Sequence, residues 1–536
     1  MFWSLQNNVA GTLIVTRGSE LPTPDLPSLD HLHVDIAIIG AGINGASAAQ
    51  HLSAAGYRVL VVDQGDFANG ATSRSSRLLH CGLRHLATGT DFWQSLLRPD
   101  RLAKSMKTVR DDMLARDEIV HTIPNRVKPI KFCIPIYDDD QYSPWQMDAA
   151  FAALRLTSPR GVPLDYQRYS PTSQNDVPIS PWLRDPDKLR SVAVFREYIF
   201  DWPERIALDA VFDARRMGAI VRNYTRVVDL KQQGQDPRWH LTLQSAHKIT
   251  PSDSDTACVT ADLVLNLAGA WVDDLIHQTG SNAAPKCTGI KGIHIALRLP
   301  EEFNDWGVFT YNSLGEPLYC LPFRGVHYVG LTRTPFTGDI AGVSASDQEI
   351  DWMISETNRC LPKLAISRDD ILYSWAGVNP LTSDPEEPLG SREIKVHDLA
   401  PDGMPNLLAL TGGPIMTHRR VARRLVKEIT GRLSPTNTPQ RPDYQGAQIL
   451  SGQKGATSIS ADKVERCVHD EMPRSLTDLL MRRLGLGWEP DQGVAQARSI
   501  AEVAAPHMGW SDARVDAELH AYQNHLAKAR RRPDAM

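Results

Sequence analysis

Four residues near the N-terminus have the types and spacing needed to bind a dinucleotide. Gly40, Gly42 and Gly45 form a G-x-G-x-x-G pattern directly after a short apolar run, and a second apolar run ends at Asp63. Gly40 permits the tight turn, Gly42 lets the backbone approach a pyrophosphate, and Gly45 lets helix and strand pack closely. The helix N-terminus favours an anion, and Asp63 can accept hydrogen bonds from a ribose diol. The order strand, glycines, helix, strand and acid predicts a dinucleotide-binding βαβ unit.

The segment that follows indicates which dinucleotide is bound. Residues 70–86 read GATSRSSRLLHCGLRHL and are dense in hydroxyl and small side chains. The second half resembles K-L-I-H-G-G-L-R-Y-L, a motif of the FAD-dependent glycerol-3-phosphate dehydrogenases within the D-amino-acid-oxidase-like flavoprotein superfamily. In that family the Ser/Thr-rich run passes along the flavin. The resemblance continues discontinuously to about residue 432, and more weakly through the C-terminal tail, and it implies non-covalent FAD as the cofactor.

Two later glycine turns match the nucleotide side of the same family. Residues 262–271, DLVLNLAGAW, predict a buried strand that runs into a glycine turn and match N-A-T-G-P-W, with alanine in place of the threonine. Residues 407–432 predict a strand, a Gly-Gly pair and a helix. The residues expected to bind FAD are Gly40, Gly42, Ile43, Asn44, Gly45, Asp63, Thr72, Ser73, Ser75, Ser76, Gly82, Val227, Ala268, Gly269, Gly412, Gly413 and Thr417.

Three residues are expected on the substrate side. Arg84 matches an arginine of the family's G-L-R-Y-L, and its guanidinium fork suits a phosphate or a carboxylate; a structural ion pair is the alternative. His294 matches the histidine of the family's K-G-S-H, which lies beside the flavin and is a candidate base. A histidine on an apolar strand is often a core residue, so this alternative stays open. Arg392 matches an arginine that binds the substrate phosphate in that family.

The substrate side also departs from the family pattern. Asn379 stands where the family has an anion-binding arginine, Pro414 replaces a lysine, and His85 replaces a tyrosine. Arg333 replaces an acid, which could restore part of the lost positive charge. A hydrogen bond to a charged group contributes about 1.5–3 kcal/mol, so losing two cations weakens a site for a phosphate dianion. We therefore expect glycerol 3-phosphate to be a poor substrate.

Composition and charge argue against several other classes of protein. The chain has 536 residues, of which 42% are hydrophobic and 23% charged, so we expect two or three folded domains. A net charge of −5 gives no reason to expect nucleic-acid binding. The seven cysteines include no C-x-x-C pair, so we expect no metal site and a reducing, cytoplasmic location.

The sequence also gives expectations about membranes. No apolar run reaches the roughly 18 residues of a membrane span, and the N-terminal extension lacks the charged region of a secretory signal. Basic residues recur at helical spacing at Arg98, Arg101, Lys104, Lys107 and Arg110. Such a face is either simply solvated or contacts lipid headgroups, which leaves peripheral contact with the inner face of the membrane open.

The predicted fold class is α/β, with a discontinuous Rossmann-like FAD-binding domain, a β-sheet substrate (cap) domain and a small helical C-terminal domain. The expected divisions are an N-terminal extension (1–33), FAD-binding segments (34–120, 195–285 and 370–434), a cap region (121–194), a substrate-domain sheet (286–369), a linker (435–470) and the helical domain (471–536).

The predicted activity follows from the resemblance. We expect oxidation of a CH–OH group of a small polyol, polyol phosphate or hydroxy acid by hydride transfer to flavin N5, with quinone or oxygen as electron acceptor, in a homo-oligomer. The alternative is an amine or amino-acid oxidase of the same superfamily. The Ser/Thr run and the Gly-Gly helix argue against an NAD-dependent enzyme, and the presence of Arg84 and His294 argues against a flavin-binding module without catalysis.

Overall fold

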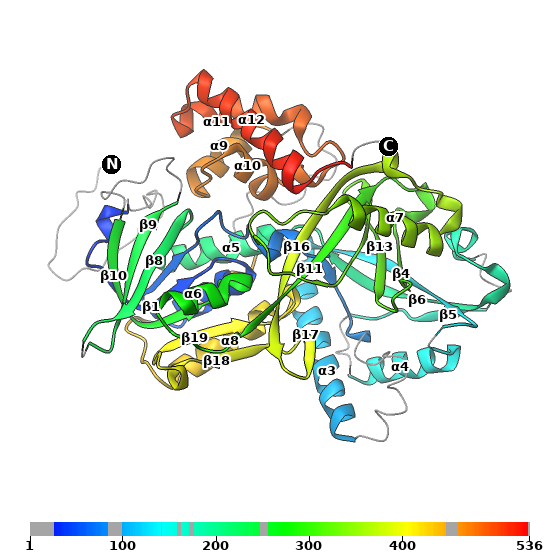
Figure 1. Cartoon of the computed structure of the whole chain (residues 1–536), viewed down its shortest axis with the longest axis horizontal. Helices are drawn as coiled ribbons and strands as arrows, with labels where there is room; N and C mark the ends of the chain where they lie inside the picture. Colours follow the sequence, from blue (N-terminus) through cyan, green and yellow to red (C-terminus); the bar gives the residue numbers. More distant parts are fainter. Residues whose placement is uncertain are drawn as a thin grey trace.

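The computed structural model describes residues 26–83, 99–140, 142–157, 162–170, 176–234, 236–246, 256–445 and 459–533. Within these residues the chain forms two large sheets and a helical C-terminal domain (Figure 1). No helix in the described ranges is both long enough and apolar enough to cross a bilayer.

The first sheet has eight strands and carries the nucleotide motif. Its parallel strands are, in spatial order, β19 (Leu407–Thr411), β10 (Thr256–Asn266), β1 (His33–Ile39), β2 (Val59–Val62) and β7 (Ile220–Arg222). Antiparallel pairing adds β18 (Lys395–Asp398), β8 (Thr225–Gln232) and β9 (Trp239–Ser245). β1 and β2 are buried almost throughout, as parallel strands covered on both faces usually are. These elements confirm the predicted βαβ unit and the strands expected at 262–271 and 407–411.

Helices cover one face of this sheet. α1 (Ile43–Ala54) packs between α5 (Pro203–Arg216) and α8 (His418–Thr430), and all three bury apolar side chains with Ile36 and Ile38 of β1. The alternate residues Ala37 and Ile39 face the opposite layer, formed by β8, β9 and α6 (Val272–Gln278). The central strands therefore have no solvent-facing side, which explains the apolar runs at 36–39 of β1 and 59–62 of β2.

The second sheet has eleven strands and is mostly antiparallel. Its main path runs β17 (Glu387–Ser391), β16 (Ile371–Asp384), β11 (Cys287–Leu297), β14 (Val326–Gly330), β13 (Pro317–Phe323), β12 (Trp306–Tyr311), β4 (Val127–Tyr137), β6 (Leu189–Phe200) and β3 (Leu78–Leu79). β15 (Thr334–Pro335) pairs with β11, and β5 (Gln167–Tyr169) pairs with β6. One face packs on α7 (Asp347–Cys360), and the other on α3 (Pro99–Thr122), α4 (Pro144–Thr157) and the C-terminal domain.

The C-terminal domain lies above both sheets in Figure 1. It consists of α9 (Ala461–Asp470), α10 (Leu476–Asp478), the π-helical turn η16 (Leu479–Arg483), α11 (Val494–Met508) and α12 (Asp512–Ala529). The predicted linker 435–470 therefore contains a helix at its end. α9 forms there because Val464 and Cys467 bury their side chains against α11.

Strand membership differs from the expected divisions in four places. β3, the end of β6, β16 and β17 lie in segments assigned to FAD binding, yet all four pair in the second sheet. Pairing is decided by partners far away along the chain, which the local apolar pattern of a strand does not specify. The domain limits themselves stay predictions.

Candidate functional site

The glycine turn after β1 has the geometry that the motif predicts. Gly40 has φ +100°, and a Cβ there would lie 2.5 Å from the carbonyl oxygen of Leu267. A Cβ at Gly45 would lie 1.9 Å from the carbonyl oxygen of Gly40, so this glycine allows α1 to start against the turn. A Cβ at Gly42 would meet only the Thr72 hydroxyl, at 3.3 Å. Gly40 and Gly45 are therefore required by the fold, whereas Gly42 leaves open the space beside the helix N-terminus.

Asp63, at the end of β2, connects directly to this turn. Its Oδ2 accepts from the N–H of Ala41 at 2.8 Å, and its Oδ1 accepts from the N–H of Gly65 at 2.9 Å. Burial raises the pKa of Asp63 to about 6, and the two N–H groups oppose the shift. Because a carboxylate oxygen can accept more than one hydrogen bond, both oxygens can still receive ribose hydroxyls.

The Ser/Thr-rich segment begins beside the same helix end. The Thr72 hydroxyl accepts from the N–H of Ile43 at 3.0 Å, and the Ser73 hydroxyl donates to the carbonyl of Ala68 at 2.6 Å. Asn44 Oδ1 is buried and has no hydrogen-bond partner among the described residues. The N–H groups at the N-terminus of α1, beside Gly42 with no side chain, fit a bound pyrophosphate, whereas the Asn44 oxygen is an acceptor and would need a donor such as a hydroxyl.

From there the segment crosses the second sheet. The chain at Arg74 lies against Gly377 of β16, where a Cβ would be 2.8 Å from the Arg74 Cβ. Two residues on, the Tyr328 hydroxyl of β14 donates to the carbonyl of Ser76, and the Ser75 hydroxyl accepts from the N–H of Arg77 at 3.2 Å. The segment thus links the nucleotide end to the sheet that carries His294.

Two further turns meet this region from β10 and β19. Gly269, which follows β10, has φ +62°, and a Cβ there would meet no described atom within 4 Å. Gly412 and Gly413 have φ +73° and +90°, and the N–H of Gly412 donates to the carbonyl of Pro380 in β16 at 2.8 Å. The carboxyl ends of β1, β10 and β19 therefore meet at one edge, where ligands of open parallel sheets bind.

The other residues predicted to contact FAD lie partly at these turns and partly elsewhere. Ala268 lies at the end of β10, with its N–H 3.3 Å from Asn266 Oδ1, and the Thr417 hydroxyl donates to the Pro414 carbonyl at 2.9 Å. Val227 is buried on β8 opposite Leu243. Gly82 instead packs against α3, with a φ of +84°. The structure brings the turn residues together but places Gly82 beside a helix.

His294 is a buried residue of β11. Its side chain stacks on Trp375 of β16, with ring centroids 4.7 Å apart and an angle of 9°, and contacts Tyr328 edge-on at 5.7 Å. The ring occupies the space over Gly330, where a Cβ would lie 2.3 Å from it. Its Nδ1 is buried and without a hydrogen-bond partner in the described part of the chain. Burial, with help from the charge of Arg77, lowers the pKa of His294 to about 3, so the imidazole is neutral.

The two predicted arginines have different outcomes. Arg84 and His85 lie outside the described residues. Arg392 is exposed in the connection between β17 and β18. Sequence reasoning missed Trp375 and Tyr328, although the alternation of β16 and β14 is the signal that places them on the histidine's face.

Two cations near the substrate side are already paired. Arg333 Nη1 lies 3.1 Å from Glu316 Oε1, and Lys291 Nζ lies 2.7 Å from Glu349 Oε2 on α7. Asn379 sits opposite Ile290 in the register of β16 and β11. Each acid offsets the charge of its cation, and whether Arg333 restores charge at the substrate site stays a prediction.

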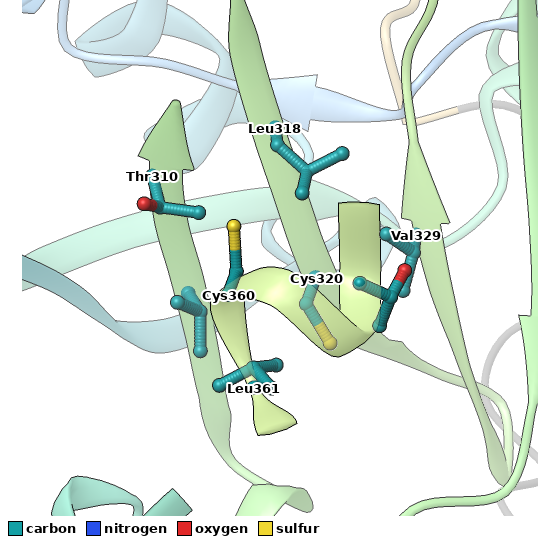
Figure 2. Close-up of a pocket in the computed structure, with 8 residues that line it drawn as sticks. Thr310, Leu318, Cys320, Val329, Cys360 and Leu361 are labelled. Atoms are coloured by element: carbon teal, nitrogen blue, oxygen red, sulfur yellow. The ribbon is translucent and has the colours of Figure 1, made fainter. Parts of the chain in front are cut away.

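A small cavity lies on the other face of the second sheet (Figure 2). Its space is about 10 Å³, roughly what one water needs. It is lined by Val308, Thr310, Leu318, Cys320, Val329, Thr357, Cys360 and Leu361. These side chains belong to the core between the sheet and α7, so the cavity is separate from the candidate site.

Comparison with known proteins agrees with this geometry. Residues 35–426 match the family model "FAD dependent oxidoreductase", and residues 437–515 match "C-terminal domain of alpha-glycerophosphate oxidase". A glycerol-3-phosphate dehydrogenase of Synechocystis is 25% identical, covering 94% of this chain and 98% of its own. A D-erythritol 1-phosphate dehydrogenase of Brucella abortus is 27% identical over 73% of this chain and 72% of its own. The fold resembles a glycerol-3-phosphate dehydrogenase of Bacillus halodurans complexed with FAD, with a TM-score of 0.69, 19% identity and coverage of 94% and 96%.

Proposed function

The chain belongs to the family of FAD-dependent oxidoreductases and is of the glycerol-3-phosphate dehydrogenase type, and from this premise we propose that it oxidises a CH–OH group of a small hydroxylated substrate. The observation that carries the proposal is the meeting of three glycine turns at one sheet edge, joined by the Ser/Thr-rich segment to the sheet that carries His294. Bound FAD supplies the two-electron acceptor for such an oxidation.

The protein's own residues have distinct tasks in this reaction. Gly42 and the N-terminus of α1 would hold the pyrophosphate, and Asp63 would hold the ribose. His294 is neutral at working pH, so a ring nitrogen can accept a hydrogen bond from the substrate hydroxyl; taking the proton requires that its pKa, about 3 without ligands, rise when FAD and substrate are bound. Its stack on Trp375 fixes the ring plane.

We propose that the substrate carries at most one negative charge on its anionic group. The relatives named above act on polyol phosphates, but Asn379 and Pro414 provide no cation, and Arg333 and Lys291 are bound to Glu316 and Glu349. A carboxylate or an uncharged polyol requires fewer cations than a phosphate dianion.

The test is a substrate screen that follows bleaching of the flavin under anaerobic conditions. Hydroxy acids and polyols should bleach it, and glycerol 3-phosphate should do so slowly. Re-oxidation by oxygen, measured as hydrogen peroxide, or by a soluble quinone identifies the acceptor. Bleaching by amines and not by any polyol would instead establish an amine oxidase. Self-association and membrane contact stay predictions.

A further inference from the structure

The C-terminal domain reaches the nucleotide-binding half through two adjacent arginines. Arg482 and Arg483 of η16 both bind the carboxylate of Asp66, and Arg483 Nη2 lies 2.8 Å from its Oδ1. The side chains of Asp66 and Arg483 are fully buried, and that of Arg482 is 4% exposed. Burial alone would raise the pKa of Asp66, but the two arginine charges outweigh it and hold the pKa at about 2.

Other contacts fix the arginine pair itself. Arg482 also binds Asp478, which in turn accepts from the Tyr224 hydroxyl at 2.8 Å, and Arg482 Nη1 lies 3.3 Å from Asn69 Oδ1. Two cations and two carboxylates balance their charges in a site closed to solvent. A buried group of this kind loses stability sharply when one partner is removed.

Asp66 belongs to the same short segment as Asp63, and this segment is hydrogen-bonded to the glycine turn. Ala41 donates its N–H to Asp63 and accepts at its carbonyl from the N–H of Ala68, at 3.0 Å. Ala68 has φ +62°, a conformation that a non-glycine residue keeps only when its surroundings hold it. The segment is thus fastened to the turn at both ends and to the C-terminal domain in its middle.

We propose that Arg482 and Arg483 are positioning residues for FAD: by holding Asp66 they set the 63–69 segment so that Asp63 and the glycine turn can bind the adenosine and pyrophosphate. The C-terminal domain then supports the cofactor-binding site without contacting the cofactor. This inference rests on the FAD binding that the proposed function requires.

The experiment compares two variants that remove one charge from equally buried groups. Arg482→Gln leaves Asp66 with Arg483 as its only paired cation, beside the Asn223 amide that donates to it at 2.9 Å. The matched control, Glu471→Gln, leaves Arg205 with Asp209 alone, in a side-chain contact that joins the C-terminal domain to α5 at 2.7 Å. Arg483 also donates to the backbone carbonyl of Glu471 at 2.8 Å, and the substitution keeps that carbonyl. FAD release from each purified holoenzyme is followed by the recovery of free-flavin fluorescence, beside its thermal denaturation.

We expect both variants to lose similar thermal stability, while Arg482→Gln weakens FAD binding about tenfold or more and Glu471→Gln less than about threefold. Arg482→Lys keeps the positive charge but loses the two-pronged guanidinium, so its FAD affinity should lie between those of wild type and Arg482→Gln. This variant provides the test if the glutamine variant does not fold. Equal FAD affinity in the arginine and glutamate variants would overturn the inference alone. A wild-type protein that binds no FAD would overturn the proposed function as well.

Discussion

Replacing His294 by phenylalanine separates a catalytic histidine from a core histidine. The substitution keeps a ring on Trp375 and removes both nitrogens. Nδ1 is buried without a partner among the described residues, and such a group costs about 1–3 kcal/mol. The larger ring over Gly330 costs a similar amount, about 1–3 kcal/mol, through overpacking. The two effects oppose each other, so the free energy of unfolding should change by no more than about 2 kcal/mol.

The alanine variant provides the contrast. His294→Ala loses the stack on Trp375 and the edge contact with Tyr328, each worth about 0.5–1.5 kcal/mol. It also leaves a cavity, which brings the total loss of stability to about 2–5 kcal/mol. The alanine variant alone therefore mixes stability with chemistry, whereas the phenylalanine variant does not.

The assay is stopped-flow reduction of the flavin by the substrate found in the screen, beside thermal denaturation of the same samples. If His294 accepts the hydroxyl proton, His294→Phe should slow reduction by about 100-fold or more while FAD stays bound. Because the pKa of His294 is lowered to about 3, its titration should give no change in wild-type rate near pH 6.5. A folded, yellow His294→Phe protein that is reduced at the wild-type rate would refute the catalytic role.

Three further predictions concern the cofactor and the substrate. Gly42→Val should fold, because a Cβ there meets only a hydroxyl, but its side chain should block the pyrophosphate and prevent FAD binding, whereas Gly45→Val should not fold. Flavin absorbance and circular dichroism distinguish the two variants. Full flavin absorbance in the Gly42 variant would contradict the assignment of this glycine. FAD affinity should fall as pH drops below about 6, by up to about tenfold per pH unit, because Asp63 must then lose a proton to accept ribose hydroxyls. Asp63→Asn should bind FAD more weakly than wild type at neutral pH, and its FAD affinity should not depend on pH in this range. A wild-type FAD affinity that is independent of pH would contradict the role of the carboxylate. Glycerol 3-phosphate should reduce the wild-type flavin slowly, and it should reduce the flavin of the double variant Asn379→Arg, Pro414→Lys faster. Fast reduction of the wild-type flavin at sub-millimolar glycerol 3-phosphate would contradict a cation-poor substrate site.

Much of the nucleotide half could be predicted because its signals are local. The parallel strands β1, β10 and β19 each end in an apolar run that is covered on both faces, and a glycine turn follows each one. The second sheet was harder to assign, because β6 and β16 pair with strands far away in the chain and their sequences do not specify which sheet they join.

The electrostatics of the site could not be predicted for a similar reason. The sequence identifies Arg333 as a cation that could replace a missing one, but only the fold shows that Glu316 already neutralises it. Likewise, nothing in the spacing connects Arg482 to Asp66, since the two are 416 positions apart. Ion pairs between distant segments depend on how the domains dock, which residue types alone do not specify.

The parallel sheet also determines when the protein can acquire its cofactor. β19 follows β1 by more than 370 residues, yet its turn completes the edge where β1 ends. At a synthesis rate of about 5–20 residues per second, β1 waits roughly 20–75 s for β19. The complete edge, with the turns after β1, β10 and β19 all in place, therefore exists only once the chain has been made beyond residue 411.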